Sequence, residues 1–158
     1  MGDVFMAAER LTDIPRPEFP LGMSVRAYRP GDAATWTRIH EDTGFYGTLS
    51  PGLHEREFGR DDTALAQRQL FVVDAEGHDI ATATAWFNDP EHDLPGGRLH
   101  WVAVVPTAQR MGVASALVGA VAARFEALGE TAAYLTTDAH NTRAIALYGR
   151  LGFRFVRR

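Results

Sequence analysis

The sequence contains no cysteine and no lysine, although it has 158 residues and 16 basic side chains, all of them arginine. The missing cysteine excludes a thiolate nucleophile, a disulfide and a thiolate metal site. The missing lysine excludes a Schiff base, a pyridoxal anchor and a Walker-type phosphate lysine. Any phosphate that this chain binds must therefore be held by main-chain N–H groups and by arginine.

Other features of the composition exclude further classes of protein. The six histidines show no HExxH or similar paired spacing, so no metal site is predicted. A net charge of -4 argues against a nucleic-acid surface. The longest apolar stretch, residues 113–123, is shorter than the roughly 20 residues of a membrane span, and the N-terminus lacks the layout of a secretory signal. The sequence predicts a soluble cytoplasmic protein with no membrane or nucleic-acid partner.

Length and composition predict one globular domain. With 46% hydrophobic and 23% charged residues, a chain of this length can bury a substantial core. Residues 1–21 contain Pro15, Pro17 and Pro20 and no sustained periodicity, so they are predicted to form an extended N-terminal arm. Residues 22–158 are predicted to form the domain.

The hydrophobic periodicity predicts an α/β fold. Asp32 is predicted to cap the first helix, and residues 41–67 are predicted to contain short helical pieces. The turn at residues 75–78 predicts an antiparallel hairpin. The expected order is β-α-α-β-β-β-α-β-α-β. The expected strands cover residues 23–28, 69–74, 79–87, 98–105, 134–137 and 153–156, and the longer helices cover 33–40, 113–128 and 142–151.

Residues 109–114 lie where a strand ends and a helix begins. At such a junction, unpaired main-chain N–H groups and the positive end of the helix dipole point outward together, which makes an anion site that needs no lysine. Gly112 allows close approach of a phosphate, and Ser115 could donate its hydroxyl. Simple initiation of a helix explains the same residues, so this motif alone is a weak signal.

Two motifs in order resemble the GNAT superfamily of acetyl-CoA-dependent N-acetyltransferases. The run QRMGVA from Gln109 to Ala114 resembles its acetyl-CoA signature, Q/R-x-x-G-x-G/A. The run NTRAIALYGRLGF from Asn141 to Phe153 resembles its next helix, N-x-x-A-x-x-L-Y-x-x-x-G-F. The resemblance covers roughly residues 23–156, and it implies a mixed, mostly antiparallel central sheet flanked by helices.

The resemblance implies acetyl-CoA as co-substrate and assigns residues to it. Main-chain amides of residues 109–114 would hold the pyrophosphate, with the charge of Arg110 nearby. The strand at residues 102–104 would pair with the pantetheine arm, and the Val102 N–H would polarise the thioester carbonyl. Met111 departs from the family, which often has a basic residue there. The implied cofactor residues are Val102, Ala103, Val104, Gln109, Arg110, Met111, Gly112, Val113, Ala114, Ser115 and Asn141.

The resemblance implies Tyr148 as the group that protonates the departing thiolate of CoA. His100 is the candidate base, because strand alternation predicts that it shares a face with Val102 and Val104. A structural role for His100 remains open, as does proton removal through water or a carboxylate. The candidate carboxylates are Glu41, Asp42 and Asp138.

The expected partner is a small-molecule or peptide amine, which would attack acetyl-CoA directly in a ternary complex. Five aromatic residues could line the acceptor pocket, although core packing is the more usual role for most of them. The alternative is a non-catalytic acyl-CoA sensor with the same fold. The short chain after Phe155 leaves the final sheet edge incomplete, and either the N-terminal arm or a homodimer contact could complete it. The aromatic candidates are Trp36, Phe45, Tyr46, Trp86 and Trp101.

Overall fold

The computed structural model describes residues 2–157, which form a seven-stranded mixed sheet. Five of the pairings between neighbouring strands are antiparallel and one is parallel. The strands are β1 (Asp3–Ala8), β2 (Ser24–Ala27), β3 (Gln69–Val73), β4 (Asp79–Trp86), β5 (Gly97–Val104), β6 (Ala133–Asp138) and β7 (Arg154–Phe155). Their order across the sheet is β2-β3-β4-β5-β6-β1-β7.

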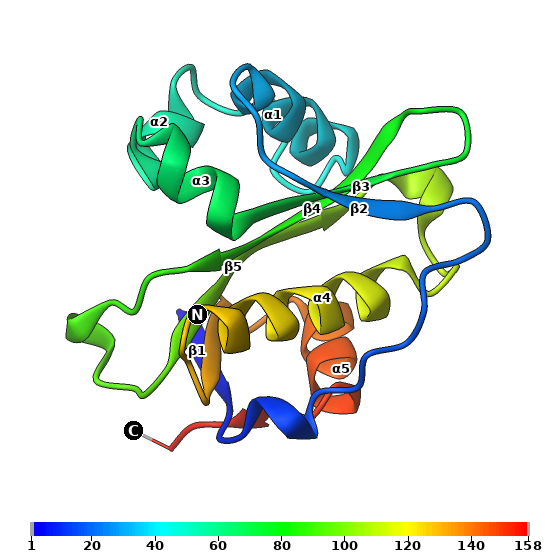
Figure 1. Ribbon diagram of the computed structural model, residues 1–158. Helices are drawn as coiled ribbons and strands as arrows, with labels where there is room; N and C mark the ends of the chain where they lie inside the picture. The colour runs from blue at the N-terminus through cyan, green and yellow to red at the C-terminus, as the bar shows by residue number, and fades with distance from the viewer. Residues whose placement is uncertain (1, 158) are drawn as a thin grey trace.

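Helices cover both faces of the sheet (Figure 1). Helices α1, α2 and α3 lie on one face, and α4 and α5 lie on the other. The expected α/β architecture and element order are confirmed, with one more helix before β3 and one more strand at the N-terminus. The helices are α1 (Asp32–Asp42), α2 (Leu53–Phe58), α3 (Asp62–Arg68), α4 (Val113–Ala127) and α5 (Thr142–Arg150), and short 3-10 turns cover Leu11–Asp13, Pro90–His92 and Pro106–Ala108.

The N-terminal segment differs most from its prediction as an extended arm. Residues 3–8 form β1, which pairs with β6 on one side and with β7 on the other. Met6, Ala8 and Leu11 are buried in the core. The prolines explain the loop that follows, but the run Val-Phe-Met-Ala before them is a strand whose partners lie more than 100 residues away. This strand completes the sheet beside β7, which was one of the two possibilities that the sequence left open.

The start of α1 is held by a buried ion pair. Gly31, with φ 98°, is the N-cap, so Asp32 is the first helical residue and not the cap that the sequence predicts. Asp32 lies 2.7 Å from Nη1 of Arg26, and a second carboxylate, Asp79, lies 2.9 Å from Nη2. Burial alone would raise the pKa of Asp32, but hydrogen bonds from Arg26 and the Arg29 amide outweigh it and lower that pKa. The network ties α1 to β2 and β4.

Two glycines let β5 and β6 meet closely at one end. Gly96 has φ 93°, and a Cβ there would lie 2.1 Å from the carbonyl oxygen of Ala132. A Cβ on Gly97 would lie 2.1 Å from the ring of Phe125 on α4. A side chain at Gly96 would push apart the only parallel pair in the described sheet, and one at Gly97 would push α4 away from the sheet. Separately, no helix of residues 2–157 has the length and apolar character needed to cross a membrane.

Candidate active site

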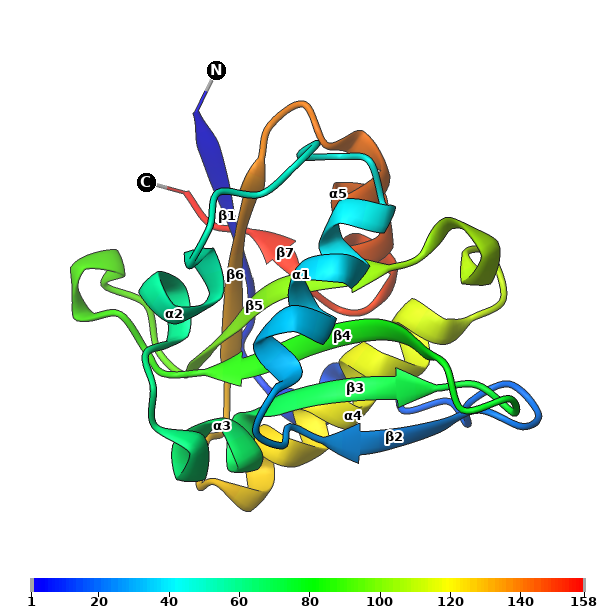
Figure 2. The same ribbon diagram turned by 90° about the horizontal axis from the view of Figure 1, so that it is seen from above.

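The strands β5 and β6 separate after a short stretch of pairing. Within the described chain they form two residue pairs, Gly97↔Ala133 and Arg98↔Tyr134. Figure 2 shows the two strands diverging beyond this point, toward the side of the molecule on which α5 lies. The edge of β5 that faces β6 therefore has no strand partner from residue 99 onward. An open strand edge can accept an extended ligand that continues the sheet.

A β-bulge interrupts β5 opposite β4. Thr84 is paired with His100 and Thr82 with Ala103, so two residues of β5 stand opposite one of β4. Trp101 occupies the bulge and has φ 55°, in the left-handed region. This conformation is uncommon for a bulky residue and stores backbone strain. The bulge lies in the part of β5 to which the resemblance assigns the thioester.

The bulge overturns the prediction that His100 shares a face with Val102 and Val104. Directly paired residues share a face of the sheet. His100 is paired with Thr84 and Val104 with Ala81, and these two residues of β4 lie three positions apart. His100 and Val104 therefore point to opposite faces. Simple alternation fails here because the bulge inserts one residue, which places both His100 and Trp101 on the side of α1 and α2.

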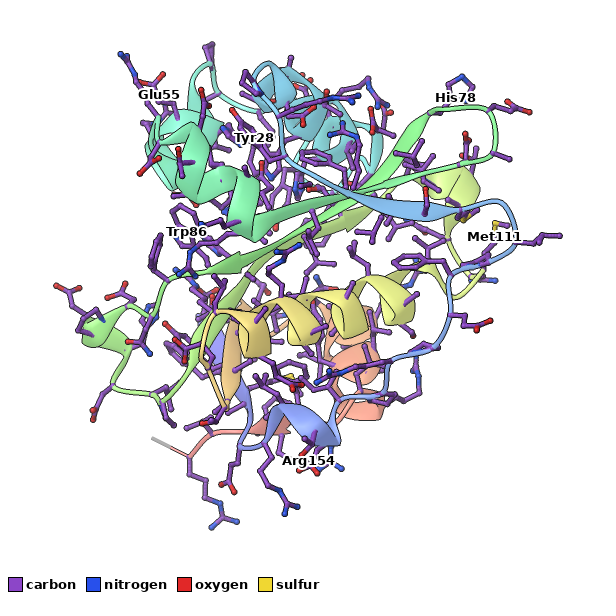
Figure 3. All side chains as sticks on the ribbon, in the orientation of Figure 1. Tyr28, Glu55, His78, Trp86, Met111 and Arg154 are labelled. Atoms are coloured by element: carbon purple, nitrogen blue, oxygen red, sulfur yellow. The ribbon has the colours of Figure 1, made fainter. Side chains whose placement is uncertain are left out.

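The loop before α4 has the geometry of an anion site. Arg110 and Gly112 both have positive φ, of 65° and 85°. Left-handed residues in such a turn can aim successive N–H groups into one concavity. Gly112 is the N-cap of α4, and no described side chain caps this helix start. A Cβ on Gly112 would meet nothing within 4 Å, and Met111 points outward beside it (Figure 3).

One polar side chain holds the start of this loop, and another caps the start of α5. The Gln109 side-chain amide donates to the Val104 carbonyl at 3.0 Å, which ties the loop to the end of β5. The Asn141 side chain accepts from the Ala144 amide at 3.2 Å, so its expected role as the cap of α5 is confirmed. Its Nδ2 remains available as a donor. The bond from Asn141 to pantetheine stays a prediction.

A carboxylate that the sequence analysis missed lies beside the bulge. Glu57 on α2 accepts a hydrogen bond of 2.7 Å from the Trp101 indole N–H. Its Oε1 also lies 3.8 Å from Nε2 of His100. The side chain of Glu57 is 34% exposed, so water can reach it. Residues 41–67 match no motif, and nothing in their pattern distinguishes Glu57 from Glu55 next to it.

The other candidate carboxylates have different surroundings. Glu41 accepts from the Leu49 amide at 2.9 Å, and Asp42 forms an exposed pair with Arg38. Asp138 ends β6, accepts from the His140 amide at 2.7 Å and acts electrostatically on Tyr46. Glu41 and Asp42 therefore serve local structure, whereas Asp138 borders the gap.

Tyr148 lies near the open ends of β5 and β6. The Tyr46 ring is 5.2 Å from the Trp101 ring on β5, and Tyr46 also interacts electrostatically with Asp138 on β6. Burial, and then the nearby Tyr46, raises the pKa of Tyr148 well above that of an ordinary phenol. Tyr148 is 8% exposed and keeps its proton throughout the physiological range.

The aromatic candidates divide between the core and the surface. Trp36 is fully buried, and the Trp86 ring contacts Phe58. The Phe45 and Tyr46 rings are 57% and 51% exposed. Tyr46 and the partly buried Trp101 are thus the aromatic pair in contact at the gap, and Trp36 supports Trp101 from beneath at 5.3 Å.

Two histidines beside Trp101 are held neutral. Burial lowers the pKa of His40 to about 4. Burial, and then the charge of Arg98, lowers the pKa of His100 to about 3. Nε2 of His40 is buried without a hydrogen-bond partner among the described residues. A neutral His100 with so low a pKa is a weak base for an ammonium group.

Other clusters lie outside this region. Among residues 2–157, Asp74, Glu76 and His78 have spacing that could hold a metal, but Asp74 is already bonded to the two neighbouring amides of the β3–β4 turn. A hollow of about 600 Å³ beside β1 and β7 is lined by Arg154 and Phe155, among others, and by none of the predicted site residues.

A family model described as the acetyltransferase (GNAT) family matches residues 32–153. The chain belongs to the GNAT acetyltransferase family. A mycothiol acetyltransferase of Pseudarthrobacter chlorophenolicus is 31% identical over 150 residues, which cover 89% of this chain and 45% of the relative. One from Salinispora arenicola is 33% identical over 154 residues, covering 89% and 47%. This GNAT chain therefore spans a little under half the length of these relatives.

Solved structures agree with the GNAT assignment. A GCN5-related N-acetyltransferase from Sphaerobacter thermophilus has a TM-score of 0.78 at 23% identity, covering 98% of this chain and 48% of that one. The ribosomal-protein-S18-alanine N-acetyltransferase of Escherichia coli has a TM-score of 0.66 at 23% identity, covering 85% and 79%. At these identities the structures show a common fold. The family model thus assigns the chain to an acetyltransferase family, and the solved structures show the fold of that family.

The neutral His100 predicts a pH dependence of stability. The unfolded chain protonates this histidine below its usual pKa of about 6.5, whereas the native GNAT domain does not do so above about 3. The free energy of unfolding therefore falls as pH falls from 6.5 to 5, and His100→Gln reduces this slope by up to about 1.4 kcal/mol per pH unit. Urea unfolding across this range measures the slope.

The control is His140→Gln. His140 is exposed, so this variant measures how much the slope changes when a surface histidine is lost. If His100→Gln changes the slope no more than His140→Gln does, His100 does not stay neutral in the native state.

Proposed function

We propose that this chain transfers an acetyl group from acetyl-CoA to a primary amine, by direct attack in a ternary complex. The observation that carries the proposal is the open edge of β5, which runs from the two residue pairs with β6 to the left-handed loop at the start of α4. A strand edge suits the amide groups of pantetheine, and the loop amides suit a pyrophosphate. One continuous main-chain surface thus matches both parts of the cofactor.

The cofactor residues that we propose act mainly through the main chain. Residues 102–104 would pair with pantetheine, and the amides of residues 109–115 would surround the pyrophosphate with the charge of Arg110 at their side. Asn141 would donate to pantetheine from Nδ2, while its Oδ1 caps α5. The exposed side chain of Met111 fits this scheme, because the loop would bind through its amides.

Gly112→Ala should weaken binding of CoA by about tenfold or more. The left-handed conformation costs a non-glycine residue about 1–2 kcal/mol, and the added methyl group would project into the open space over the loop. Gly31→Ala is a matched control, because Gly31 is the left-handed N-cap of α1 and also faces open space. Calorimetry gives the affinity, and urea unfolding gives the stability.

Both variants should lose similar stability, and Gly31→Ala should bind CoA as the wild type does. Equal affinities in the two variants would contradict a phosphate site at the loop.

Acetyl transfer needs a proton donor for the CoA thiolate, and we propose Tyr148 for this role. A phenol can donate to a thiolate whose conjugate acid has a pKa of about 8.5 when the two atoms meet. The raised pKa of Tyr148 keeps its proton in place until the thiolate forms. Its electrostatic contact with Tyr46, whose ring lies 5.2 Å from the Trp101 ring of β5, supports a position beside the gap between β5 and β6.

Tyr148→Phe should lower kcat by about 100-fold, because general acid catalysis typically contributes that much or more. The KM for acetyl-CoA should stay within about twofold, since the cofactor is held elsewhere. Tyr28→Phe is the matched control: it removes a phenol that is bonded to Asp62 at 3.0 Å, on the side of α3. Release of the CoA thiol measures turnover. A Tyr148→Phe variant with full kcat would refute the acid assignment.

For the proton of the attacking ammonium group we propose Glu57, directly or through one water, in place of His100. The neutral His100 is a weak base, whereas Glu57 is a partly exposed carboxylate beside the bulge. The hydrogen bond from Trp101 orients its Oε1. The strained backbone of Trp101 therefore serves to bring an indole N–H to this carboxylate.

Glu57→Gln should lower kcat/KM near neutral pH by about 100-fold and leave a smaller deficit as pH approaches the pKa of the acceptor amine. The glutamine keeps an oxygen for the Trp101 N–H, so the bulge is preserved. The neighbouring Glu55→Gln, on the same helix, is the control. A pH–rate profile that is parallel to that of the wild type at every pH would exclude Glu57 as the base.

A panel of amines tests the function as a whole. The relatives' name makes mycothiol-related amines one group to include, beside amino acids, peptides and antibiotics. The missing cysteines remove background from a thiol-release assay. Tight binding of acetyl-CoA without turnover of any amine would favour the alternative, a non-catalytic acyl-CoA sensor. Neither function requires a metal, a membrane or a nucleic acid, and a homodimer is compatible with both.

A further inference from the structure

Arg98 is a cation that faces the acceptor side of the gap without a carboxylate partner among the described residues. It is paired with Trp86 on β4, and the Trp86 ring packs 5.1 Å from Phe58 of α2. Arg98 therefore points to the same face as His100 and Glu57. Its Nη2 donates to the Thr136 hydroxyl of β6 at 3.1 Å, so the side chain crosses the gap between β5 and β6 near its narrow end.

The surroundings of Arg98 leave it under-satisfied. A guanidinium group carries five N–H donors and prefers a planar carboxylate as its partner. The Nε of Arg98 is buried and has no hydrogen-bond partner in the described structure. No ion pair of Arg98 occurs among residues 2–157, although Glu57 lies on the same side of the sheet, with Oε1 3.8 Å from Nε2 of His100. The residue as a whole is partly exposed.

Arg68 is a second arginine with a buried Nε, and its other contacts within the protein compensate for this. Its Nε is also buried without a partner. Its guanidinium, however, lies 3.6 Å over the ring of Phe87 and donates to the Ala85 carbonyl, away from the gap. An aromatic face and a carbonyl compensate Arg68. Arg98 has one hydroxyl and lies where the acceptor has to approach.

We propose that Arg98 binds an acidic group of the acceptor, which makes the acceptor an amino acid or a similar molecule that carries a carboxylate near its amine. This inference rests on the proposed transfer to an amine. Arg98 would receive the carboxylate, and Glu57, which lies beside His100, would face the ammonium group. The acceptor would thus lie along β5, with each of its two charges next to a side chain of opposite charge.

Paired acceptors test this directly. The probes are glycine, β-alanine, γ-aminobutyrate and 5-aminovalerate, each beside its own carboxamide, with rates expressed per free amine so that differences in amine pKa cancel. The wild type should show kcat/KM at least about tenfold higher for the acid than for the amide at one or more spacings, because an arginine–carboxylate pair is a strong charge-assisted contact. Arg98→Gln should bring this ratio close to one.

Two further variants separate charge from structure. Arg68→Gln removes the other arginine with a buried, unpaired Nε and should keep the preference for acids. Arg98→Lys keeps the charge but loses the planar fork, so it should keep part of the preference. If Arg98→Gln does not fold, the wild type decides: equal kcat/KM for acid and amide at every spacing would overturn the proposal.

Binding separates failure of this inference from failure of the proposed function. With CoA bound, the NMR signal of the Arg98 Nε–H group, assigned by its loss in Arg98→Gln, should shift on addition of the acids and not of the amides. Acid-specific shifts without turnover would support the inference and count against catalysis. Equal shifts with acids and amides would overturn the inference. Equal turnover of acids and amides by the wild type would also overturn it and would leave the acetyl transfer intact.

Discussion

The parallel pairing of β5 with β6 is the constraint on which the site depends. It is limited to two residue pairs, where Gly96 and Gly97 allow a contact with Ala132 and Phe125 that any side chain would block. Beyond those pairs the strands separate, and the main chain of β5 is left without a partner. The open edge of β5, the left-handed loop at its end and the position of Tyr148 are arranged around this separation. A fully paired β5 and β6 would have a stable sheet and no room for a cofactor.

The bulge at Trp101 changes which face of the sheet the side chains of β5 point to. Because an extra residue is inserted, His100 and Trp101 both point toward α1 and α2, while Val104 returns to the opposite face. The left-handed φ of Trp101 is unfavourable for a bulky residue, and the packing of its ring against Trp36, together with its hydrogen bond to Glu57, compensates for this. The acceptor face thereby gains an oriented carboxylate close to the strand edge that we assign to acetyl-CoA.

The parts of this structure that could be predicted from the sequence are local ones. The loop from Gln109 to Ala114, the cap at Asn141 and the hairpin of β3 and β4 follow from turn chemistry and periodicity within a few residues. The role of β1, the bulge, and the positions of Glu57 and Arg98 depend on pairing between distant segments. Prolines after residue 14 favoured an arm, because nothing local shows that residues 3–8 have partners in β6 and β7. Strand alternation misplaced His100 for the same reason, since a bulge is a property of two strands.

The neighbours of His100 favour a role for it as a neutral residue and not as the catalytic base. It shares one face of β5 with Arg98, two residues before it, and its Nε2 lies 3.8 Å from Oε1 of Glu57. Burial, together with the charge of Arg98, keeps the imidazole uncharged, so it forms no ion pair with Glu57. A charged His100 would pair with Glu57 and compete with an ammonium substrate. The neutral ring therefore lets a cation and a carboxylate coexist on one face, where both can meet a substrate of complementary charge.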